Sequence, residues 1–205
     1  LFKERKYPKS ETILKGILDK NPNHLKSNYL ISDLYFRKAQ YGKALIHIKK
    51  ILSIDAYDSD ANFIAGNIYK ALNSLYDAKE AYGWASRSTK YKSAALSQIS
   101  EIYLIEKKYN DAISYAKESL NYNRLNLNAL EILSISNRIL KNNAESNKWI
   151  DNILFLDPLN HFARFELYLI DPAESNWKRF SDKVRNEFPE QTYLEIAISY
   201  FERNL

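Results

Sequence analysis

Small residues recur along this chain at a constant interval of about 34 residues, which is the period of a two-helix repeat. One column holds only alanine or serine, at Ser10, Ala44, Ala78, Ala112 and Ser146. The positions four and seven residues further on are mostly apolar, as on one face of a helix. The interval constrains the fold strongly, because each repeat must build the same pair of helices and bury its apolar face against its neighbours.

A second column of small residues lies in the other half of each repeat. It contains Ser32, Gly66, Ser100 and Ser134, and the positions three residues further on hold Tyr35, Tyr69, Tyr103 and Asn137. Two helices that cross closely need small side chains at the crossing, since large ones would hold the backbones apart. We therefore predict that the two small columns face each other within each helical hairpin, and that the tyrosines fill the space beside the crossing.

The pattern of Gly66, Tyr69, Ala78, Tyr82 and Ala85 resembles the tetratricopeptide repeat. This resemblance implies an all-α solenoid, in which helical hairpins stack into a right-handed superhelix with a concave ligand face. It predicts one solenoid over residues 1–205, divided into a partial repeat at 1–24 that keeps only its second helix, full repeats at 25–58, 59–92, 93–126 and 127–160, a divergent repeat at 161–190 and an orphan helix at 191–205. Because the chain opens partway through a repeat, we expect it to be a fragment of a longer protein.

The divergent repeat is predicted to hold helices at 161–170 and 172–188, and the orphan helix is expected at 192–204. Asp171 is a candidate N-cap for the second of these helices, because its carboxylate can accept from an unpaired backbone N–H. Pro172 would suit the first helical position, where its missing N–H is not needed.

Composition agrees with a helical chain and excludes several classes of site. Only four glycines and five prolines interrupt the sequence, which favours helices over a sandwich or barrel. Cysteine is absent, so thiolate metal sites and disulfides are excluded and the compartment stays open. The net charge of +5 is spread over interspersed acids and bases, and no apolar run approaches the ~18 residues of a membrane span. We expect a soluble chain with no membrane insertion.

Candidate ligand-contacting residues are those on the first helices that the repeat columns do not use. In this family the first helices line the concave groove, so the resemblance predicts a protein or peptide partner there. Aromatic residues would supply contact area, and Arg37, Lys70 and Arg138 could hold acidic groups. Leu104 and Ile135 are further apolar groove positions. The groove candidates are Lys26, Tyr29, Asp33, Phe36, Arg37, Phe63, Asn67, Lys70, Gln98, Glu101, Glu131 and Arg138.

No catalytic constellation is visible in the sequence. His24, His47 and His161 lie in different repeats without metal-ligand spacing, and the glycines form no phosphate-binding loop. We therefore expect no enzyme activity of this region, no metal and no cofactor. Truncated ends could favour self-association.

Other functions are weaker alternatives. The stretch from Asn160 to Glu195 resembles tails of large bacterial proteins that carry a carbohydrate-associated domain upstream, which would make the chain a non-catalytic docking region of a carbohydrate-active enzyme. RNA reading would need the same polar pair in every repeat, and the groove columns do not repeat one, so we expect no nucleic acid partner. Chaperone tails are also disfavoured, because only Asn67 matches the lysine and asparagine set that holds their carboxylate.

Overall fold

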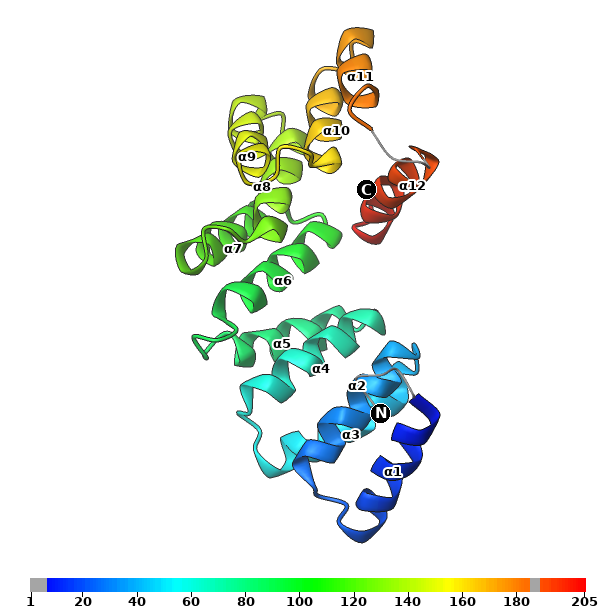
Figure 1. The fold of residues 1–205 in the computed structure, drawn as a ribbon. Helices are drawn as coiled ribbons and strands as arrows, with labels where there is room; N and C mark the ends of the chain where they lie inside the picture. Colours follow the sequence, from blue (N-terminus) through cyan, green and yellow to red (C-terminus); the bar gives the residue numbers. More distant parts are fainter. Residues whose placement is uncertain (1–6, 185–188) are drawn as a thin grey trace. The chain divides into compact units, whose positions relative to one another are not determined.

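The computed structural model describes residues 7–184 and 189–205, and their regular secondary structure is entirely helical (Figure 1). The helices are α1 (Tyr7–Lys20), α2 (Leu25–Arg37), α3 (Tyr41–Ile54), α4 (Ser59–Ala71), α5 (Leu75–Ala85), α6 (Lys92–Ile105), α7 (Tyr109–Tyr122), α8 (Leu127–Ile139), α9 (Asn143–Leu156), α10 (His161–Ile170), α11 (Glu174–Ser181) and α12 (Pro189–Glu202). Consecutive helices form stacked hairpins, so the chain is the all-α solenoid that the repeat predicts.

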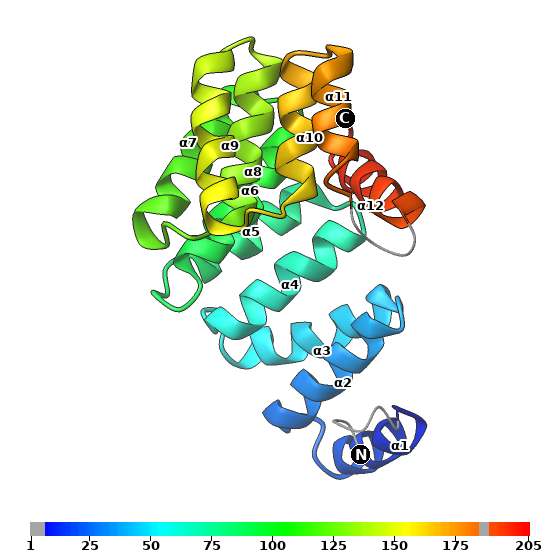
Figure 2. The ribbon, with the colours of Figure 1, turned by 45° about the horizontal axis from the view of Figure 1, so that its top comes forward.

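The chain divides into two compact units, residues 1–95 and 96–205. In unit 1, α1 precedes the hairpins α2/α3 and α4/α5. Unit 2 contains most of α6, then α7, the hairpins α8/α9 and α10/α11, and α12. Within unit 2, α8, α9, α10 and α11 lie as neighbouring helices (Figure 2). We call α2, α4, α6, α8 and α10 the first helices, and α3, α5, α7, α9 and α11 the second helices.

Polar side chains start the first helices at matching places in the sequence. His24, Asp58, Asn126 and Asn160 are N-caps whose side chains accept a hydrogen bond from the backbone N–H three residues ahead. Such a cap satisfies one of the N–H groups that a helix start leaves unpaired.

The turn inside each full hairpin also repeats. Ala39, Asn73, Lys107 and Lys141 all have positive φ angles, between 54° and 61°. In each case the N–H of the following residue reaches back to the carbonyl five residues earlier, as in Gln40 to Tyr35 at 2.9 Å. This closure pairs a terminal carbonyl and reverses the chain sharply, so the second helix can pack back on the first.

The two small columns meet inside the hairpins, as predicted. The Ser32 hydroxyl donates to the Ala44 carbonyl at 3.0 Å, and the Ser100 hydroxyl donates to the Ala112 carbonyl at 2.7 Å. In the α8/α9 hairpin the direction reverses, because the Ser146 hydroxyl donates to the Ser134 carbonyl at 2.8 Å. Side chains this small allow the two backbones to approach closely. Each of these hydroxyls donates a hydrogen bond to a backbone carbonyl of the neighbouring helix.

Each unit has its own apolar core. The core of unit 1 gathers buried leucines, isoleucines and alanines from α1 to α5, with Ile31, Leu34 and Ile48 fully buried. The core of unit 2 runs through α6 to α10 and includes the fully buried Leu104 and Ile135. The prediction that Leu104 and Ile135 face a groove was therefore wrong, since both side chains fill the space between helices.

The start of α11 differs from its predicted position. Asp171 is the C-cap of α10, in an extended conformation, and its N–H donates to the Leu167 carbonyl. Proline disfavours the α region for the residue before it, so the chain stays extended there and α11 begins at Glu174, with Ala173 as N-cap. The assignment of Asp171 as the N-cap and of Pro172 as the first helical residue was therefore wrong. The predicted end of this helix at position 188 lies outside the described residues.

Glu11 links α1 to the first full hairpin and predicts a measurable pH dependence. Its carboxylate contacts Lys15 at 2.8 Å and Lys38 at 2.6 Å, and it accepts from the Tyr35 hydroxyl at 3.2 Å. Hydrogen bonds from Lys15 and Lys38 lower the pKa of Glu11 to about 2. A carboxyl whose pKa is lowered by folding stabilises the protein above its ordinary pKa, and that contribution is lost as the pH falls towards 2.

We expect Glu11→Gln to lower the free energy of unfolding by less than ~1 kcal/mol at neutral pH, because the Lys15 side chain is largely solvent-exposed and the Lys38 side chain is partly exposed. The difference from the wild type should shrink as the pH falls through 4 and vanish near 2. Urea titrations of both proteins across this range measure it. A difference that does not change with pH would contradict the ion-pair origin.

Candidate functional site

The first helices of unit 2 hold another helix of the same chain. Arg203, directly after α12, is 7% exposed, and its guanidinium lies against side chains of α6 and α8. Its Nη2 contacts Glu131 Oε2 at 2.7 Å and Asn128 Oδ1 at 3.3 Å, and its Nε lies 3.6 Å from Glu101 Oε1. One arginine therefore joins the end of α12 to two glutamates on successive first helices.

Tyr200 anchors the same helix on α10, which lies next to α12 in Figure 2. Its ring stacks on Phe162 with 5.5 Å between centroids and meets the edge of Phe165 at 5.8 Å. Its hydroxyl donates to Glu166. The aromatic contacts bury apolar area, and the hydroxyl gives the buried carboxylate a partner.

Glu166 is fully buried, and its carboxylate forms a bidentate ion pair with the guanidinium of Arg138. Arg138 Nε donates to Oε2 at 2.8 Å, and its Nη2 donates to Oε1 at 3.0 Å. Burial and the adjacent Glu166 raise the pKa of Tyr200, so its hydroxyl stays a donor. Burial also raises the pKa of Glu131, against the opposing effect of Arg203. We call Glu101, Asn128, Glu131, Arg138, Phe162 and Glu166 the first-helix face of unit 2.

Three of the predicted groove residues are thus brought together in unit 2. Glu101 and Glu131 contact Arg203, and Arg138 holds the carboxylate that Tyr200 contacts. Gln98 is partly buried on α6. The contacts with α12 were not predicted, because nothing in a repeat pattern indicates where a helix beyond the last repeat will pack.

Three predicted residues in unit 1 have structural contacts within the unit. The Tyr29 hydroxyl donates to Asp58, the N-cap of α4. The Phe63 ring stacks on Tyr91 at 4.6 Å. Asn67 accepts a hydrogen bond from the Tyr82 hydroxyl at 2.7 Å. These contacts join a helix to a neighbouring helix or to the residue just before one, so Tyr29, Phe63 and Asn67 contribute to the packing of unit 1.

The remaining predicted residues of unit 1 form a more accessible surface. Lys26 and Arg37 are exposed, while Asp33, Phe36 and Lys70 are partly buried. Arg37 Nε pairs with Asp33 Oδ2 at 2.9 Å, and the Phe36 ring packs on Tyr41 at 5.4 Å. We call these five residues the first-helix face of unit 1. It combines an aromatic ring, three bases and one acid.

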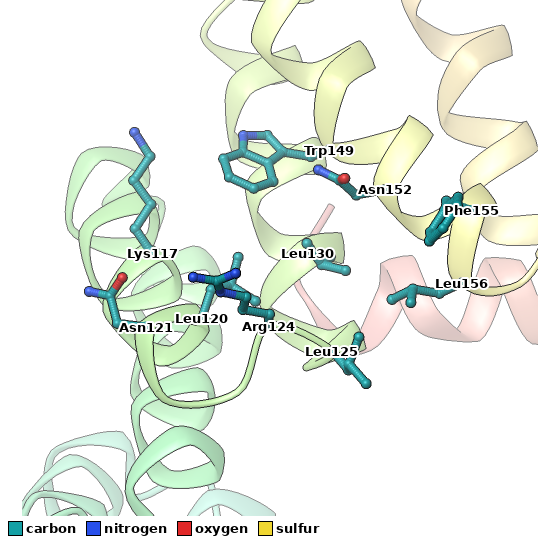
Figure 3. A pocket seen from close by; sticks show the side chains of 10 residues that line it. All are labelled: Lys117, Leu120, Asn121, Arg124, Leu125, Leu130, Trp149, Asn152, Phe155 and Leu156. Carbon is teal, nitrogen blue, oxygen red and sulfur yellow. The ribbon is translucent and has the colours of Figure 1, made fainter.

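A pocket that the sequence did not indicate lies between α7 and α9, on the second helices of unit 2 (Figure 3). It has a volume of about 500 Å³. Leu120, Leu130 and Trp149 form part of its apolar lining, and Lys117 and Arg124 also line it. The lining contains no acidic side chain. Such a pocket suits an apolar group that carries negative charge nearby.

Two of the histidines, His24 and His47, have local structural contacts. His24 caps α2, and the pKa of His47 is lowered mainly by burial; its ring contacts Asn28 Oδ1 at 2.9 Å. In the described part of the chain, no group of three or more histidine and acidic residues is placed to hold a metal. None of the described helices has both the length and the apolar character needed to cross a membrane.

Comparison with known proteins gives a likeness of fold alone. No family model and no curated protein matches the sequence. Among solved structures, a tetratricopeptide repeat protein from Parabacteroides merdae has a TM-score of 0.79 at 16% identity, covering 98% of this chain and 83% of that one. PilW, a type IV pilus biogenesis factor, has a TM-score of 0.78 at 15% identity, covering 94% and 93%. YrrB, a repeat protein with an unusual peptide-binding site, has a TM-score of 0.64 at 14% identity, covering 93% and 95%. The stacked hairpins and these neighbours together show that the chain has the tetratricopeptide-repeat fold.

Proposed function

We propose that this chain is a protein-interaction scaffold that binds a peptide segment of a partner on its first helices. The observation that carries the proposal is the placement of α12. On the first-helix face of unit 2, Glu101 and Glu131 contact Arg203, directly after α12. Glu166 accepts from Tyr200 of α12, a helix that belongs to no repeat hairpin. The first helices of this sequence therefore have side chains suited to hold a further segment.

The same repeat positions occur in unit 1, where they support binding of a separate peptide. Asp33 precedes Glu101 by two repeat intervals, so the two acids occupy matching places on their helices. Beside Asp33, the ring of Phe36 offers apolar contact, and the exposed Lys26 and Arg37 offer charges. Aromatic contact combined with charges at the rim is a common means of recognising peptides. YrrB, which shares the fold, has a peptide-binding site by its description.

The proposal is tested by affinity capture from an extract of the source organism. The wild type is compared with Lys26→Glu/Arg37→Glu, which reverses two exposed charges on the first-helix face of unit 1. The variant should recover at least tenfold less of the partner protein than the wild type does. Charges at the edge of an interface speed association and favour partners of complementary charge.

The matched control is Lys20→Glu/Lys49→Glu, which makes the same charge change at exposed positions of α1 and α3. It should recover the partner as the wild type does, and circular dichroism should show equal helix content in all three proteins. Equal recovery by all three, or recovery of nucleic acid or glycan in place of a protein, would contradict the proposal.

A further inference from the structure

The side of α12 that faces away from Arg203 and its partners is apolar. Leu194, Ile198 and Phe201 follow one another at helical spacing and are 59%, 45% and 83% exposed. On the opposite side, Ile196 and Arg203 are buried. The anchoring of Arg203 and Tyr200 therefore sets the rotation of α12 and keeps its apolar stripe outward. A stripe of large apolar side chains in water is a common mark of an interface.

Acidic residues accompany this stripe. Glu190, Glu195 and Glu202 are exposed, and α12 from Pro189 to Glu202 contains no lysine or arginine. We call Leu194, Ile198, Phe201 and these three glutamates the outer face of α12. It has the character of an acidic amphipathic helix, which needs a partner surface that is apolar and basic.

The pocket between α7 and α9 has that character. Phe155 is 85% exposed and Leu125 is 65% exposed at its lining, so apolar surface continues outside the cavity. Lys117 and Arg124 are exposed, and neither forms an ion pair with another described residue. In Figure 3, Lys117 and Arg124 lie across the pocket from Trp149 and Phe155. The two basic side chains can pair with two glutamates of a partner helix. The apolar lining of the pocket can contact the apolar side chains that lie between those glutamates.

We propose that the outer face of α12 of one copy docks into the α7–α9 pocket of a second copy. The two surfaces are different, so the contact is head-to-tail and can continue into short chains of copies. Pairing of two outer faces of α12 is disfavoured, because it would bring glutamates together. Few residues take part, so the association is weak and visible only at high protein concentration. It involves neither first-helix face and is independent of the proposed peptide binding.

Reciprocal charge reversal tests the proposal by sedimentation velocity over a concentration series. The wild type should increase in average mass with concentration, and added salt should reduce this effect. Lys117→Glu/Arg124→Glu disables the pocket, and Glu195→Lys/Glu202→Lys disables the helix. Each variant alone should remain monomeric. An equimolar mixture should regain the concentration-dependent association of the wild type. The intact helix of one variant meets the intact pocket of the other, and the reversed helix meets the reversed pocket, so every contact again joins opposite charges.

All four substituted side chains are exposed, and circular dichroism verifies that each variant keeps its helix content. Lys178→Glu/Lys183→Glu on and after α11 is the control with an equal charge change, and it should associate like the wild type. The proposal is overturned if the wild type stays monomeric throughout, if either charge variant associates as the wild type does, or if the mixture stays monomeric.

Discussion

Replacing Arg138 by methionine should lower the free energy of unfolding by about 3–5 kcal/mol, because it leaves a buried carboxylate without its charged partner. Glu166 is fully buried, and its two oxygens accept from the Arg138 fork at 2.8 and 3.0 Å. The remaining donor is the Tyr200 hydroxyl. Chemical denaturation of wild type and variant at neutral pH measures the loss.

Two further variants separate a buried charge from lost packing. In Arg138→Met/Glu166→Met both charges are gone, and most of the lost stability should return, since replacing a whole buried pair with apolar groups costs little. Arg37→Met breaks the exposed pair with Asp33 and should cost less than ~1 kcal/mol. If the double variant is as unstable as Arg138→Met, the loss does not come from the unpaired carboxylate.

Gly66→Ala should destabilise unit 1 by about 1–3 kcal/mol, although alanine favours helix formation. A Cβ atom at position 66 would lie 2.6 Å from two ring carbons of Tyr82. The Tyr82 ring is fully buried and its hydroxyl bonds to Asn67 at 2.7 Å, so it has little room to move. The measurement is the midpoint of thermal or urea unfolding.

Gly83→Ala is the matched control for this substitution. Gly83 also lies within a helix, α5, but a Cβ atom there would meet nothing within 4 Å. It should stabilise the protein by up to ~1 kcal/mol through helix propensity alone. If both substitutions shift the midpoint in the same direction, the close approach of α4 and α5 at Gly66 is not what requires glycine.

Much of the fold follows from the sequence because packing rules repeat with the period. Small residues such as Ser32 and Ala44 must meet where two helices cross, and they are joined by a hydrogen bond in the structure. The start of α11 did not follow, since Asp171 and Pro172 satisfy the preferences of a helix start and of a helix end equally well. Local preferences cannot choose between these two roles.

The candidate site was less accessible to prediction. A repeat pattern indicates which positions of a first helix are free, but not which of them another segment will cover. Glu101 and Glu131 were predicted as groove residues from their free positions on the first helices, whereas their contact with Arg203 depends on a helix outside the repeats. The α7–α9 pocket was missed because Leu120 and Trp149 look like core residues in sequence. The exposed Phe155 and Leu125, which extend the apolar surface outside this pocket, are evident only in the structure.

The most direct test of peptide binding on the first helices is site-specific photo-cross-linking in cells of the source organism. A photoreactive phenylalanine at position 36 places the probe on the first-helix face of unit 1. The same probe at Ile46, which is 58% exposed on the second helix α3, is the control. The proposed function predicts that position 36 cross-links the protein recovered by affinity capture and that position 46 does not. Cross-linking of that protein at position 46 alone, or equally at both, would contradict binding on the first helices.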